Sequence, residues 1–356
     1  MHASLERLRE RTNGYTVTPA QYVRTAYIAL GALTLIVLTG AAVRLTGSGL
    51  GCPTWPKCYG NVYPPLNSHA IIEFSNRMIT FPVCVAAGAA WLFALRRRPY
   101  RRDLMWNGAL LPLGVVGQAV LGGFTVKGAL DYGWVMGHFA LSMLIVLAAV
   151  VLCWRATHEP ESADEAVSKG AVADGAVAKV TETARVLTDR TIVLALRGLA
   201  AFGALTIVAG TAATAAGPHA GGSPGQKINR LDFDGRGTMD FVIHRHAEIA
   251  FLFSLAAVAI WWLARRREVG EQVQRPLTIL CVLLAIQGAV GLDQYETHLP
   301  TELVWVHVGL ACAAWISVLW AACAAGPLAS RSTENAPDRA VESQLRPTSP
   351  LEFPGN

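Results

Sequence analysis

Long uncharged apolar runs recur along the whole chain, and each predicts a helix that crosses a membrane. Six runs contain between 18 and 24 residues without a charge, which is enough for a helix to cross roughly 30 Å of hydrocarbon. These runs cover residues 25–43, 78–95, 104–126, 132–154, 198–217 and 303–326. Two shorter runs, 249–264 and 276–292, reach this length if the first begins near Phe241 and the second extends to the interface. The pattern predicts an all-α membrane protein with eight transmembrane helices.

Polar residues within or just before these runs recur in two sets, about 169 positions apart. The first set is Asn76, Arg77, Gln118 and His138, and the second is His244, Arg245, Gln287 and His307. The glutamine precedes the last histidine by 20 residues in both sets, and the first member precedes the glutamine by 42 or 43 residues. This agreement predicts a duplicated unit, and hence two pseudo-symmetric four-helix bundles.

Composition divides the chain into five segments. Residues 25–154 and 191–326 form the two predicted four-helix halves. Residues 155–190 are rich in Ala, Glu, Ser, Lys and Asp and predict a weakly structured linker, and residues 327–356 predict a disordered tail. Residues 1–24 form an N-terminal segment without a cleavable signal. The halves therefore carry the chemistry.

The distribution of arginines predicts the orientation in the membrane. Hydrophobic residues make up 53% of the chain and charged residues 15%, as expected of an integral membrane protein. Five arginines lie between residues 96 and 102 and four between 265 and 275, whereas the loops 127–131 and 293–302 hold one lysine between them. The positive-inside rule then places the linker, the tail and both termini in the cytoplasm, with the protein in the cell membrane. The net charge of +5 reflects this topology and does not indicate nucleic-acid binding.

The predicted topology brings the candidate site residues to the outer face of the membrane. These residues are Glu73, Asn76, Arg77, His138, His244 and His307. Histidines that face each other across a four-helix bundle suit axial ligation of haem, although a single membrane histidine can also simply bond a neighbouring helix. We expect His244 and His307 to bind one haem iron. His138 shares its half with Asn76, which is a poor iron ligand, so that half would hold a haem through one ligand or loosely.

Glu73 precedes Asn76 by three residues and Arg77 by four, so all three share a helical face. The carboxylate could move protons or stabilise charge at a reacting group, or it could form only an ion pair with Arg77. Arg77 and Arg245 could each pair with a haem propionate or anchor a helix at the headgroups.

Four other histidines are weaker candidates because they lie in or beside outer loops and lack a repeat counterpart. They are His69, His219, His246 and His298. Of these, His246 could replace His244 if the helical register shifts by about half a turn.

The cysteines at positions 52 and 58 differ from the other five, which lie in apolar helices. They occur in the outer loop GSGLGCPTWPKCYG, on the side of the membrane where disulfides persist. A structural or redox-active disulfide is the favoured interpretation, and a metal site is disfavoured because two sulfurs leave the coordination incomplete. The corresponding loop of the second half, residues 217–240, has no cysteine.

Several of these motifs together resemble the haem A synthase family. They are GSGLGCPTWPKC, PPLNSHAIIEFSNR, GHFALS around His138, IHRHAE around His244 and WVHVGL around His307. The resemblance covers nearly all eight helices and excludes the linker and the tail. It implies two four-helix halves that convert haem O into haem A by successive hydroxylations of a ring methyl group, giving a formyl group for cytochrome oxidase.

The resemblance also implies a role for each half. His244 and His307 would hold a resident haem b, whereas haem O, supplied by its farnesyltransferase, would bind around Glu73 and His138. The pair Cys52 and Cys58 matches the disulfide of the family. The chain departs from the family at Asn76, where the motif often has histidine, and in lacking a second cysteine pair in the C-terminal half.

Two other classes of function use some of the same residues. A b-type cytochrome that passes electrons in the membrane would need two complete histidine pairs, and the sequence predicts one. A transporter would place polar residues near the middle of the bilayer, whereas these gather at one face. The electron donor, the oxygen source and the oligomeric state are left open, with a homo-oligomer among the possibilities.

Overall fold

The computed structural model describes residues 14–159, 190–223, 225–233 and 237–326. Eight helices in these ranges are each long and apolar enough to cross a membrane, which confirms the predicted all-α membrane fold. They are α2 (Pro19–Leu45), α3 (Ser68–Arg96), α4 (Arg102–Lys127), α5 (Tyr132–Thr157), α8 (Arg190–Ala216), α9 (Thr238–Arg266), α10 (Glu271–Glu296) and α11 (Thr301–Ala324). Almost all of the predicted linker, and the whole tail, lie outside the described residues.

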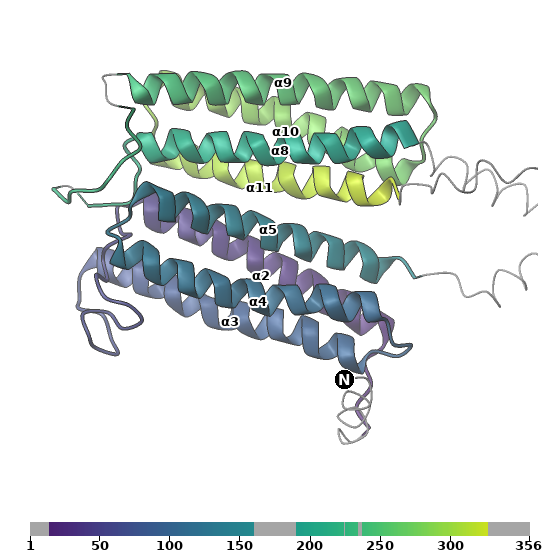
Figure 1. The fold of residues 1–356 in the computed structure, drawn as a ribbon, viewed down its shortest axis with the longest axis horizontal. Helices are drawn as coiled ribbons and strands as arrows, with labels where there is room; N and C mark the ends of the chain where they lie inside the picture. Colours follow the sequence, from purple (N-terminus) through teal and green to yellow (C-terminus); the bar gives the residue numbers. More distant parts are fainter. Residues whose placement is uncertain (1–13, 160–189, 224, 234–236, 327–356) are drawn as a thin grey trace, which may run out of the picture.

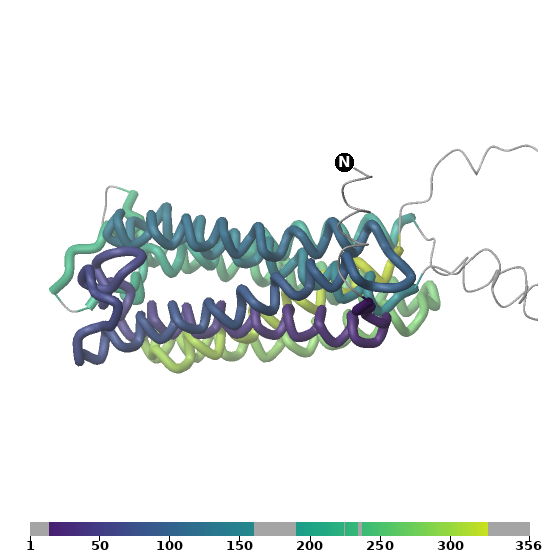
Figure 2. Tube along the Cα trace, turned by 90° about the horizontal axis from the view of Figure 1, so that it is seen from below, coloured from purple at the N-terminus to yellow at the C-terminus, as the bar shows by residue number. Residues whose placement is uncertain are grey.

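The helices run side by side along the long axis of the molecule in two groups (Figures 1 and 2). Helices α2 to α5 pack mainly on one another, and so do α8 to α11. The groups meet through α5 and α2 on one side and α11 and α8 on the other. The exact limits of the two halves as units, and the orientation of the termini, stay predictions.

Several helices begin before the apolar runs that predicted them, because polar residues start them. Thr18 caps α2: its hydroxyl accepts from the Gln21 N–H, and the Gln21 side chain accepts from the Thr18 N–H. Pro19 then occupies the first turn, where its missing N–H costs no hydrogen bond. Asn67 caps α3 in the same way through the Ala70 N–H. The α2 helix therefore starts six residues before the run at 25–43.

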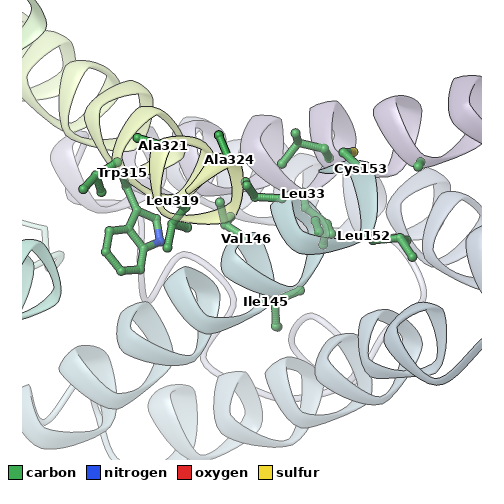
Figure 3. Packing of buried hydrophobic residues seen from close by; sticks show 14 of the residues in the cluster. Leu33, Ile145, Val146, Leu152, Cys153, Trp315, Leu319, Ala321 and Ala324 are labelled. Carbon is green, nitrogen blue, oxygen red and sulfur yellow. The ribbon is translucent and has the colours of Figure 1, made fainter. Parts of the chain in front are cut away.

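The buried core runs through both groups of helices and across the junction between them. Figure 3 shows Leu33 of α2, Val146 of α5 and Trp315 and Leu319 of α11 among its members. The Trp315 indole donates a hydrogen bond to the Met143 carbonyl oxygen at 3.1 Å, and this bond joins α11 to α5 inside the core. Small helical displacements between the groups would therefore break a buried polar contact.

Large apolar side chains cover the outer surface of the bundle. Phe81, Leu113 and Phe251 have 73%, 67% and 63% of their surface exposed. In water such exposure would be costly, whereas a lipid environment accepts it without loss. This distribution agrees with a multi-pass membrane protein.

Loops at one end of the molecule join the two groups. The Gly49 N–H donates to the Gly221 carbonyl at 2.8 Å, and the Ser223 hydroxyl donates to the Gly47 carbonyl at 2.8 Å. In Figure 1 these loops, described over residues 46–67, 217–223 and 225–233, lie at the end opposite the start of α2. The candidate site residues lie toward this end.

Candidate functional site

A pair of histidines faces each other between α9 and α11. The ring centres of His246 and His307 are 6.3 Å apart, and the ring planes are inclined by 75°. Both Nδ1 atoms are buried and have no hydrogen-bond partner in the described part of the chain. A metal shared between two imidazole nitrogens, with bonds of about 2 Å, would separate the ring centres by about 6 Å. The ring separation therefore matches that of two imidazoles that share one metal ion.

His244 and Arg245, predicted for this site, point elsewhere. The His244 ring is exposed, lies near Tyr295 and has its Nδ1 2.6 Å from the Asp240 carbonyl oxygen. The Arg245 guanidinium pairs with Glu248 at 2.5 Å on the exposed surface. Two residues along a helix correspond to a rotation of about 200°, so His246 and His244 cannot both face α11. The structure thus brings His246 to His307 in place of His244.

A glycine on a neighbouring helix lies against each of the inward-facing residues. A Cβ atom at Gly210 of α8 would lie 3.0 Å from the His246 ring, and one at Gly291 would lie 3.3 Å from the His307 ring. In the other half, a Cβ atom at Gly40 would lie 4.0 Å from Asn76 Nδ2. The pairs Gly40 to Asn76 and Gly210 to His246 both span 36 residues. Because both residues pack against a glycine 36 positions earlier, Asn76 in the first half occupies the place that His246 occupies in the second half.

His138 in α5 occupies a position like that of His307 in α11. A Cβ atom at Gly122 would lie 3.5 Å from the His138 ring, and the buried Nδ1 of His138 has no partner among the described residues. The Gln118 amide donates to the His138 carbonyl at 2.9 Å, and the Gln287 amide donates to the His307 carbonyl at 3.1 Å. These matched bonds hold the two histidine-bearing turns in the same way.

Glu73 is buried and connects α3 to the cysteine loop. One carboxylate oxygen accepts from the Cys52 N–H at 2.6 Å, and the other accepts from the Arg77 guanidinium at 2.5 Å. Arg77 also donates to the carbonyls of Cys52, Thr54 and Pro56. The predicted ion pair is therefore present, and the Arg77 donors are directed to the loop and to Glu73.

The cysteine loop folds over the end of the first helical group. Cys52 and Cys58 form a disulfide and are fully buried. The Trp55 ring lies 3.2 Å from a Cβ atom placed at Gly123, the residue next to the glycine that contacts His138. The loop thus contacts α4 directly beside His138.

The remaining candidate histidines lie outside these two arrangements. His69 is bonded to the Ser48 hydroxyl at 3.0 Å, His219 is bonded to the Leu299 carbonyl at 2.7 Å, and His298 is exposed. Over the described residues, no group of three or more His, Cys, Asp or Glu could hold a metal ion. A haem iron requires only its axial ligands from the protein.

A separate small pocket of about 10 Å³, room for roughly one water molecule, lies between the two helical groups near the joined loops. Its lining includes Arg44 of α2, Tyr132 of α5, Thr214 of α8 and Asn229 of the second loop. None of the candidate ligands lines it, so it is distinct from the histidine sites.

Comparison with known proteins agrees with these features. Residues 24–319 match the COX15-CtaA family model, described as cytochrome oxidase assembly protein. A heme A synthase from Lysinibacillus sphaericus is 33% identical over 134 residues, which are 36% of this chain and 42% of that protein. One from Bacillus licheniformis is 31% identical over 140 residues, which are 38% of this chain and 45% of that protein.

Two further relatives match this chain over different lengths. A heme A synthase from Shewanella oneidensis is 24% identical over 299 residues, which are 77% of this chain and 88% of that protein. A protoheme IX farnesyltransferase from Thermus thermophilus is 31% identical over 157 residues, which are 39% of this chain and 25% of that protein. The chain thus spans less than half the length of the Lysinibacillus and Bacillus relatives and most of the Shewanella relative.

Proposed function

Since this chain belongs to the COX15-CtaA family of cytochrome oxidase assembly proteins, we propose that it converts haem O into haem A in the cell membrane. The reaction oxidises one ring methyl group. Each of two hydroxylations adds one oxygen atom to the methyl carbon and removes two electrons from it, which an external oxidant accepts. The first gives CH₂OH and the second gives CH(OH)₂, which loses one water molecule to leave the formyl group. The observation that carries the proposal is the family match over eight spanning helices together with histidines at equivalent places in both halves.

We assign the resident haem b to the C-terminal half, with His246 and His307 as its axial ligands. The ring separation of 6.3 Å and the two unpartnered Nδ1 atoms support this assignment. Gly210 and Gly291 support it further, because they leave room at the edges of both rings. Haem b supplies reversible one-electron chemistry when it is bound. His244, the ligand expected from the sequence motif, is exposed and is replaced in our assignment.

We assign haem O, the substrate, to the N-terminal half, with His138 as its single axial ligand. Asn76 occupies the position that corresponds to His246, and a carboxamide is a poor ligand for iron. A haem held through one protein ligand can leave after reaction, as a substrate must. The unequal halves therefore suit one permanent haem and one exchangeable haem.

The cysteine loop would cover the substrate site. Its contacts with Glu73 and Arg77, and the approach of Trp55 to Gly123 beside His138, support this role. Both carboxylate oxygens of Glu73 are occupied, so the contacts favour Glu73 as a residue that positions the loop. Proton transfer by the Glu73 carboxylate stays a prediction, as does redox activity of the disulfide.

The orientation and the partner also belong to the proposal. We place the histidine sites near the outer face, with the arginine-rich connections in the cytoplasm. The similarity to a Thermus protein named protoheme IX farnesyltransferase supports such an enzyme as the source of haem O. The lipid bilayer is the remaining partner.

The test is to express the chain together with a source of haem O, extract the pigments and measure haem A. We expect haem A from the wild-type chain and from His298→Ala, which changes an exposed loop histidine. We expect His138→Ala to make none while it retains the b-type spectrum. If the wild-type chain keeps a b-type spectrum but yields no hydroxylated or formyl haem, the electron-carrier alternative replaces the proposal.

A further inference from the structure

The side chain of Asn76 is held in one orientation by a neighbouring helix. The Thr39 hydroxyl of α2 lies 2.8 Å from Asn76 Oδ1 and 3.3 Å from the Ile36 carbonyl oxygen, and its one hydrogen is donated over the shorter distance, to Asn76. With its oxygen engaged, the carboxamide presents its Nδ2 amine, which carries two N–H donors. Within the described residues, Nδ2 has no acceptor. The amine is therefore a free and oriented hydrogen-bond donor.

The position of this amine follows from the matched contacts of the two halves. Asn76 packs beside Gly40 as His246 packs beside Gly210, and His138 packs beside Gly122 as His307 packs beside Gly291. The His246 ring faces the His307 ring. By the same arrangement, Asn76 lies on the face of α3 that corresponds to the His246 face of α9.

We propose that Asn76 donates a hydrogen bond to an oxygen-bearing or diatomic ligand on the open side of the haem O iron, and that Thr39 positions it to do so. The inference rests on the proposed binding of haem O through His138. Hydrogen-bond donors on the open side of a haem decide whether a small ligand is bound, released or activated. A donor oriented before the ligand arrives stabilises it without reorganisation at that moment.

Asn76 therefore has a function that a histidine at the same position could not provide. A histidine at this place would offer iron a second nitrogen ligand and close the open side. The carboxamide leaves the open side free and supplies a donor to whatever binds there. Thr39 acts only through Asn76, so it is a positioning residue.

The test uses the full chain loaded with haem O, with cyanide and carbon monoxide as probe ligands. The variants are Asn76→Leu, which removes the donor, Thr39→Val, which removes only the hydroxyl, and Thr39→Ser, which restores it. We expect the cyanide dissociation constant to rise roughly threefold to tenfold in the first two variants, the effect of one hydrogen bond. We also expect their C–O stretching frequency to rise, because a donor near the oxygen weakens that bond. Thr39→Ser should resemble the wild type.

Asn76→His adds a second test, because the new imidazole should convert the haem O spectrum to a six-coordinate form and block carbon monoxide. The b-type spectrum of the other half reports whether each variant is folded.

If haem A is formed but Asn76→Leu and Thr39→Val leave the C–O stretch and the cyanide affinity unchanged, the inference is overturned and the proposed function stands. If wild-type haem O binds no carbon monoxide, the open side does not exist and the inference is also overturned. Absence of haem A from the wild type would instead contradict the proposed function.

Discussion

Replacement of Glu73 by glutamine should release the cysteine loop. The Glu73 carboxylate accepts from the Cys52 N–H and from Arg77 in a buried setting, where hydrogen bonds to charged groups are worth about 1.5–3 kcal/mol each. Glu73→Gln keeps the shape of the side chain but removes its charge. Because Arg77 keeps its loop carbonyls, we expect the local opening of the loop to become easier by about 2–4 kcal/mol and not by the full sum.

The buried disulfide provides the assay for this prediction. Cys52 and Cys58 have no exposed surface, so a water-soluble reductant reaches them only when the loop opens. The expected change in opening corresponds to a rate of reduction that is roughly 30-fold to 700-fold higher. Glu248→Gln is the matched control, because it removes an exposed partner of Arg245 and should change the rate by less than about twofold. An unchanged reduction rate in Glu73→Gln would refute the account of Glu73 as the residue that holds the loop.

Two further predictions concern the helix contacts. Gly210→Ala should displace the His246 ring and weaken the b-type signal, since the new methyl would lie 3.0 Å from that ring, whereas Gly198→Ala on the same helix meets no atom within 4 Å and should leave the spectrum unchanged. The prediction fails if both variants bind haem equally. Trp315→Phe should lower the free energy of unfolding in detergent by about 1–3 kcal/mol, because the buried Met143 carbonyl loses its donor. An unaltered melting temperature would show that this bond does not stabilise the junction.

The sequence predicted the helices better than it predicted which face of a helix is turned inward. Uncharged runs are sufficient to find spanning helices, because lipid exposure demands apolar residues on every side. The same uniformity removes the amphipathic stripe that marks the buried face of a helix in a soluble protein. Helix α9 is the consequence: its span was predicted, but the structure turns His246 toward His307, and the sequence had given His246 only as the alternative to His244.

Spacing could not distinguish His244 from His246. Asn76 precedes Gln118 by 42 residues, whereas His244 precedes Gln287 by 43 and His246 precedes it by 41. The arginine that follows both Asn76 and His244 favoured the first alignment. The 36-residue spacing of Gly40 to Asn76 and of Gly210 to His246 favours the second, and it could have been found in the sequence. Its importance becomes clear only when the glycines are found against these side chains.

Contacts between the cysteine loop and α3 required the three-dimensional structure. The spacing of Glu73 and Arg77 predicted their ion pair, because residues four apart share a helical face. The bonds from these side chains to the backbone of residues 52–56 depend on how the loop folds back, and no local pattern specifies that. For the same reason the Thr39 contact with Asn76 could not be predicted.

The most direct measurement is the visible spectrum and haem content of purified His246→Ala and His244→Ala, prepared side by side. We predict that His246→Ala loses the stable b-type signal and that His244→Ala retains it, because only the His246 ring faces His307. The opposite result, with haem b lost from His244→Ala and kept by His246→Ala, would contradict the assignment of the permanent haem site.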